Sequence, residues 1–156
     1  MRILFVGDIF GAPGRQAVHT HVPRLREELR LDAVIANGEN AAHGKGLGRK
    51  QAEEIRQSGV DVITLGDHAW DQREMLAHIE QDSRILRPAN FPPAAPGKGV
   101  TVFETHLGKK IAVLNLIGRT FMEPHDDPFR RADEILETLR LGKGAEAILV
   151  DFHAEA

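Results

Sequence analysis

Four short apolar stretches of the chain each end in side chains that favour metal ions. The stretches close on the strings FVG, IANG, VITLG and LVDF. The polar residues that follow them are Asp8, Glu39 with Asn40, Asp67 with His68, and His153. Carboxylate, amide and imidazole groups without a thiolate among them are typical ligands of the divalent metals used in hydrolysis. These positions therefore indicate a hydrolytic metal site.

The apolar stretches themselves have the composition of buried strands. Short runs of Val, Ile and Leu that close on Gly or a polar residue are typical of parallel sheets. Ligand and catalytic groups of open α/β sheets gather at the carboxyl ends of such strands. We therefore expect five ligand residues to converge: Asp8, Glu39, Asn40, Asp67 and His153.

Each of these residues has a simpler structural interpretation when it is taken alone. Asp8 fits a turn or a helix cap, and His153 fits an exposed or structural histidine. Asp67 is harder to explain as a cap, because Asp71 and Glu74 already have the spacing of a capping box. The metal-site hypothesis depends on all four strand ends carrying the same chemistry.

The elements predicted around these positions describe one α/β domain over residues 1–156. Strands are expected at about 2–6, 33–36, 60–65, 85–86 and 147–152, and helices from Pro13, over 49–58, over about 71–79 and from Pro128. Two apolar runs between Val100 and Ile117 flank Gly108 in the pattern of a hairpin.

The composition is that of an ordinary globular protein. The chain has 156 residues, 42% of them hydrophobic and 28% charged, with a net charge of −3. No basic surface for a long nucleic acid is therefore expected, and no run approaches the ~20 apolar residues of a membrane span. The chain contains no Cys, which excludes thiolate ligands and is typical of a reducing compartment, so we expect a cytoplasmic protein with no membrane partner.

Several strings of the chain resemble one enzyme family. FVGD, ANGEN, GDHAWD and DFHAEA are similar to motifs of the calcineurin-like metallophosphoesterases. The strings NAAHGKGLG, RPANFP and NLIGRTFM resemble the YmdB-type bacterial phosphodiesterases within that family. The resemblance runs from Met1 to Ala156 and implies an α/β fold, a layered metallophosphoesterase-like sandwich.

The resemblance also implies a two-metal site and a substrate class. Glu39 would bridge two divalent ions, Mn or Fe, and His68 would protonate the leaving alkoxide without binding metal. The other ligands would form two pairs, one for each metal: Asp8 with Asn40, and Asp67 with His153. The family acts on small phosphodiesters, including cyclic nucleotides, so the implied function is a metal-dependent phosphodiesterase.

The chain departs from the family pattern in two ways. The family has Asn before the catalytic His, where this chain has Asp67. The family also carries a later His-x-His ligand pair that is not found after His153. The resemblance thus implies an incomplete domain that lacks its C-terminal portion, binds metal weakly, has little or no phosphodiesterase activity and forms a homo-oligomer. The alternative is a non-catalytic α/β interaction or oligomer subunit.

Overall fold

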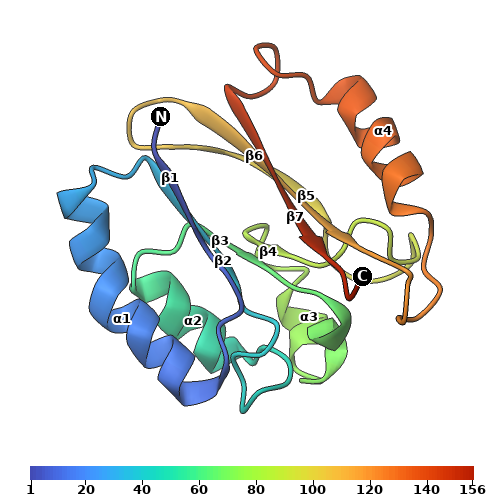
Figure 1. The fold of residues 1–156 in the computed structure, drawn as a ribbon, viewed down its shortest axis with the longest axis horizontal. Coiled ribbons are helices and arrows are strands. Elements are labelled where there is room, and N and C mark those ends of the chain that lie inside the picture. The colour runs from blue at the N-terminus through green and yellow to red at the C-terminus, as the bar shows by residue number, and fades with distance from the viewer.

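A computed structural model describes residues 1–156, which form two β-sheets with helices on their outer sides (Figure 1). Sheet A has the strand order β1-β2-β3-β4, and sheet B has the order β5-β6-β7. The strands are β1 (Ile3–Val6), β2 (Ala33–Asn37), β3 (Val62–Thr64), β4 (Ile85–Leu86), β5 (Val100–Glu104), β6 (Lys110–Ile117) and β7 (Ala147–His153). The helices are α1 (Gly11–Glu28), α2 (Arg49–Gln57), the 3-10 helix η1 (Asp67–Trp70), α3 (Met75–His78) and α4 (Pro128–Thr138).

All four strands of sheet A run parallel, as the sequence predicts. Every residue of β2 and β3 is buried. The reason is that α1 and α2 pack on the outer face of the sheet, where Val18, Val22 and Ile55 join Val34 and Ile63 in one core cluster. The inner face of the same strands packs against sheet B.

Sheet B combines the predicted hairpin with a parallel third strand. β5 and β6 pair antiparallel, and β7 pairs parallel with β6 after the chain crosses through α4. Asp127 caps α4, because its carboxylate accepts hydrogen bonds from the backbone amides of Phe129 and Arg130. α4 covers the outer face of the sheet, where Ile135 packs against the core cluster that contains Leu114 and Leu116.

The two sheets meet through an apolar layer between them. Ile35 and Val62 of sheet A pack with Phe103, Ile111 and Val113 of sheet B. His153 is the last residue of β7 and lies in register with Ile117 of β6. This stacking brings the carboxyl end of β7 beside the carboxyl ends of β2 and β3.

One local prediction is wrong. No helix spans 71–79, and the chain forms η1 and the single turn α3 in its place. The capping box fails because the carboxylate of Glu74 accepts a hydrogen bond from the backbone amide of Arg49, at the start of α2. A tertiary partner thus replaces the local one. The third strand is also shorter than predicted, and the last strand extends through His153.

Candidate metal centre

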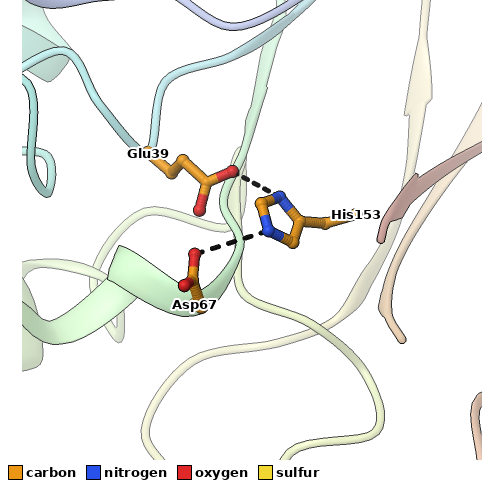
Figure 2. Close-up of side chains that lie close together, drawn as sticks. All are labelled: Glu39, Asp67 and His153. Atoms are coloured by element: carbon orange, nitrogen blue, oxygen red, sulfur yellow. Dashed lines mark ion pairs between the residues drawn. The ribbon is translucent and has the colours of Figure 1, made fainter. Parts of the chain in front are cut away.

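Glu39, Asp67 and His153 converge from three separate strand ends (Figure 2). Each offers one ligand atom, and these atoms lie within 4.8 Å of one another. Glu39 Oε1 is 2.6 Å from His153 Nδ1, and Asp67 Oδ1 is 3.4 Å from His153 Nε2. The imidazole therefore lies between two carboxylates, one contributed by the loop after β2 and one by the first residue of η1.

The three side chains fit a divalent cation. His153 Nε2 is buried and has no hydrogen-bond partner, although Asp67 Oδ1 lies within ion-pair distance. A buried ring nitrogen without a hydrogen-bond partner, in an imidazole that lies between two carboxylates, is the arrangement expected of a metal ligand. Oxygen and imidazole ligands without sulfur suit Mn²⁺, Fe²⁺ or Zn²⁺.

The position of Glu39 depends on two neighbouring features of sheet A. The side chain of Asn37 accepts a hydrogen bond from the backbone amide of Glu39 at 3.3 Å, which orders the turn after β2. Gly66, just after β3, leaves room for the carboxylate, because a Cβ atom there would overlap the carboxylate atoms of Glu39. Glu39 is only 2% exposed, so its charge needs a partner.

A second set of side chains links Asp8, Asn40 and His68. Asn40 Nδ2 donates to Asp8 Oδ1 at 2.9 Å, because a carboxylate can only accept. Asn40 Oδ1 therefore faces His68 Nδ1, 2.9 Å away, and this nitrogen carries the proton. His68 Nε2 is left free of this chain of hydrogen bonds.

His68 also connects the two sets. Its backbone amide donates to Glu39 Oε2 at 3.4 Å, and its Nδ1 lies 3.7 Å from Asp67 Oδ1. The structure thus brings all six sequence-predicted residues into one network of contacts, with three of them in the tight cluster of Figure 2. Their roles as ligands and as proton donor remain predictions.

The electrostatics of the cluster favour a charged imidazole. The hydrogen bond to Glu39 raises the pKa of His153 above its usual value, and burial opposes this only in part. The charges of Glu39 and Asp67 add to the rise in pKa. A cation must displace this proton, so metal binding should be coupled to proton release.

Sequence reasoning missed the residues that support this cluster. Gly66 is visible in the string TLGD, but only the fold shows that its missing Cβ makes room for Glu39. Asp151 lies two residues before His153 and points to sheet A, where its carboxylate accepts a hydrogen bond from Thr64 Oγ1. The only signal for Asp151 in the sequence is a charged residue inside an otherwise apolar strand.

Two further features are a cavity on the surface and the hydropathy of the helices. A surface cavity of about 760 Å³ lies away from the metal centre, near the C-terminal ends of α1 and α2. No helix is both long enough and apolar enough to cross a bilayer.

Known proteins resemble this chain in sequence and in structure. The chain is 49% identical over 156 residues to a Bacillus subtilis (strain 168) protein named 2',3'-cyclic-nucleotide 2'-phosphodiesterase. A crystal structure of a hypothetical protein from Thermus thermophilus superposes with a TM-score of 0.91 at 46% identity. A phosphatase from Mycoplasma pneumoniae superposes with a TM-score of 0.86 at 34% identity.

These similarities cover the whole of this chain but only part of each relative. All of this chain aligns with 58% of the B. subtilis protein and 59% of the T. thermophilus chain. The M. pneumoniae match covers 99% of this chain and 55% of the phosphatase. The predicted metallophosphoesterase-like sandwich and the resemblance to the YmdB type are confirmed. Since the family model described as YmdB-like protein matches residues 4–156, the chain belongs to the YmdB-like family.

Proposed function

We propose that this chain carries the metal centre of a metal-dependent phosphodiesterase. The observation that supports this proposal is the convergence of Glu39, Asp67 and His153, with the buried His153 Nε2 lacking a partner. Two divalent ions, Mn or Fe, would be held by two ligand pairs with Glu39 between them: Asp8 with Asn40, and Asp67 with His153. When bound, such ions supply positive charge to the phosphate oxygens and activate water.

His68 is the proposed proton donor to the leaving oxygen. Asn40 accepts from its Nδ1, which fixes the ring orientation and leaves Nε2 to deliver a proton. Positioned acid catalysis of this kind is worth ~10²–10⁴-fold in rate. The His68 ring is half-buried, so it remains accessible to a bound ester. Asp8 holds Asn40 in turn, which makes a three-residue chain behind the donor.

The proposed substrates are small phosphodiesters, with 2',3'-cyclic nucleotides first among them. The name of the B. subtilis relative supports this class, and that relative is 49% identical across the whole of this chain. Because the chain spans 58% of that relative, residues outside the chain could contribute to its specificity. We therefore propose only the reaction class for this chain, and we propose that the reaction takes place in the cytoplasm.

Metal analysis and turnover on one preparation test the proposal. The purified chain is loaded with Mn²⁺ or Fe²⁺, its metal content is measured, and hydrolysis of bis-p-nitrophenyl phosphate and of 2',3'-cyclic AMP is followed. Glu39→Gln keeps the shape of the side chain but removes its charge, so metal and turnover should both fall. Thr101→Val in β5 is the control. A wild-type chain that binds no metal and has no turnover would favour the non-catalytic alternative.

Self-association is the second part of this proposal. Val150 and Phe152 of β7 are 46% and 38% exposed, and Phe129 of α4 is 71% exposed beside Phe152. Exposed apolar side chains that lie together favour association with a partner. We propose a homo-oligomer through this face, which light scattering of wild type and Phe152→Ser can test. A monomeric wild-type chain would contradict it.

A further inference from the structure

A carboxylate of sheet B crosses the sandwich and contacts sheet A just beneath the metal centre. Asp151 Oδ2 accepts a hydrogen bond from Thr64 Oγ1 at 2.5 Å and from Asn37 Nδ2 at 3.4 Å. Thr64 is fully buried and Asn37 nearly so. The layer around them is apolar, and hydrophobic contacts have no preferred direction, so these hydrogen bonds are directional links between the two sheets.

A second polar side chain reinforces the same link from the adjacent strand. Asn115 of β6 lies in register with Asp151 of β7. Its Nδ2 donates to the backbone oxygen of Leu65 at 2.6 Å and to that of Leu86 at 3.0 Å. Asp151 thus contacts β2 and β3 of sheet A, and Asn115 contacts the backbone at the ends of β3 and β4.

Asp151 and its two partners each lie two or three residues before a residue of the metal centre. Asn37 precedes Glu39, and its Oδ1 accepts from the Glu39 amide. Thr64 precedes Asp67 by three residues. Asp151 precedes His153 by two, so the two side chains leave β7 on the same face. The polar link therefore forms the row of side chains directly below the cluster.

We infer that Asp151, through Thr64 and Asn37, is a positioning residue that fixes His153 of sheet B against Glu39 and Asp67 of sheet A. This inference rests on the proposed function, because it assumes a bound metal. The contacts among Asp151, Thr64 and Asn37 are present in the chain without it. Metal–ligand distances vary by only about 0.2 Å in well-formed sites. A small slide of one sheet across the other would therefore separate His153 from the carboxylates.

Substitutions at Thr64 test this role. Thr64→Val keeps the shape and removes the hydroxyl, whereas Thr64→Ser keeps the hydroxyl. We expect Thr64→Val to weaken Mn²⁺ binding by about 10–100-fold, as losses of supporting hydrogen bonds around metal ligands do, and Thr64→Ser to restore it. Asp151→Asn should also retain binding, because its amide oxygen can still accept from Thr64. Calorimetric titration with Mn²⁺ gives the dissociation constants.

Two controls separate positioning from general stability. Thr101→Val makes the same change in β5, where the hydroxyl has no hydrogen bond. Ile35→Val removes a methyl group from the buried layer between the sheets without touching the polar link. Urea unfolding is measured for every variant. Equal metal affinities of Thr64→Val and wild type, or losses in Ile35→Val that match those in Thr64→Val at equal stability, would overturn the inference.

A measurement on metal-free protein makes the inference independent of the proposed function. The ¹⁵N shift of His153 Nδ1 reports its contact with Glu39 and should change in Thr64→Val but not in Thr101→Val. Asp151→Ala, which removes the carboxylate that contacts Thr64 and Asn37, replaces Thr64→Val if that variant does not fold. A wild-type chain that binds no Mn²⁺ would overturn the proposed function, whereas an unchanged His153 shift would overturn the positioning role.

Discussion

Glu39 Oε1 lies 2.6 Å from His153 Nδ1, which joins the loop after β2 to the last residue of β7. Neither residue is fully solvated, since Glu39 is 2% exposed and the His153 side chain is 19% exposed. The buried Glu39 carboxylate is therefore paired with the His153 imidazole of the other sheet. This pairing raises the pKa of His153, so the stability of the metal-free fold depends on pH.

The metal-free chain should lose stability as the pH rises above about 6.5, the ordinary pKa of a histidine. The pKa of His153 is higher in the folded chain than in the unfolded chain. Its contribution is therefore complete below the unfolded value of about 6.5 and is lost as the pH rises through the folded value. Urea unfolding in chelator should show this decline in wild type and a weaker decline in His153→Gln.

Metal should reverse this trend. An imidazole must lose its proton to bind a cation, so Mn²⁺ affinity should increase over the same pH range. The Mn²⁺-dependent rise in unfolding free energy should then be larger at high pH, because a tighter ligand stabilises the folded state more. Identical pH slopes for wild type and His153→Gln in chelator would show that the Glu39–His153 pair has no such role.

Most of the fold could be predicted because its signals are local. The apolar runs of sheet A, the hairpin around Gly108 and the cap at Asp127 each depend on residues within a few positions. Strand ends also predict the gathering of ligand candidates, because parallel strands place their carboxyl ends at one edge. The approach of Glu39 and Asp67, which follow β2 and β3 of one sheet, fits that rule, whereas His153 reaches them through the stacking of sheet B on sheet A.

The remaining features depend on tertiary contacts that a sequence pattern does not encode. Glu74 has the spacing of a capping box, yet Arg49, which is distant in sequence, takes its carboxylate. The meeting of sheets A and B sets which residues of β7 reach β3, so the contact of Asp151 with Thr64 emerges only in the fold. The role of Gly66 likewise emerges only in the fold, because its missing Cβ leaves the space that the Glu39 carboxylate occupies.

His68→Ala should lower kcat strongly without loss of metal. The imidazole is held by Asn40 and is not among the three clustered ligand atoms, so its removal leaves the cluster in place. We expect a decrease of ~10²–10⁴-fold, the usual contribution of a positioned acid. Long incubations at high protein concentration, with metal content measured on the same sample, give the result. A parallel loss of metal would make His68 a ligand, and an unchanged kcat would remove it from the mechanism.

Asp67→Asn should change turnover or metal preference. Asp67 Oδ1 lies 3.4 Å from His153 Nε2 and 3.7 Å from His68 Nδ1, so the variant removes a negative charge next to both imidazoles. Less negative charge should strengthen the attraction between the metal centre and an anionic phosphodiester. We expect a higher kcat/KM or a different metal content. Asp133→Asn on α4 is the control, and wild-type behaviour of Asp67→Asn in both measurements would contradict the prediction.

Gly66→Ala should weaken metal binding by moving Glu39. A Cβ atom at this position would overlap the Glu39 carboxylate, which cannot move far because it is buried. The displaced carboxylate would lose its 2.6 Å contact with His153. Loss of a hydrogen-bond partner of a metal ligand typically lowers metal affinity by ~10–100-fold, and we expect at least this loss of Mn²⁺ affinity in Gly66→Ala. Isothermal titration of the folded variant measures it.

Gly7→Ala is the matched control for this change. Gly7 lies next to Asp8 at the end of β1, and a Cβ atom there would meet nothing within 4 Å. The same chemical substitution is therefore made beside another predicted ligand, but without displacing a side chain. Normal Mn²⁺ affinity in Gly7→Ala together with a loss in Gly66→Ala would locate the effect at Glu39. Normal affinity in both variants would mean that the position of the Glu39 carboxylate does not control the metal centre.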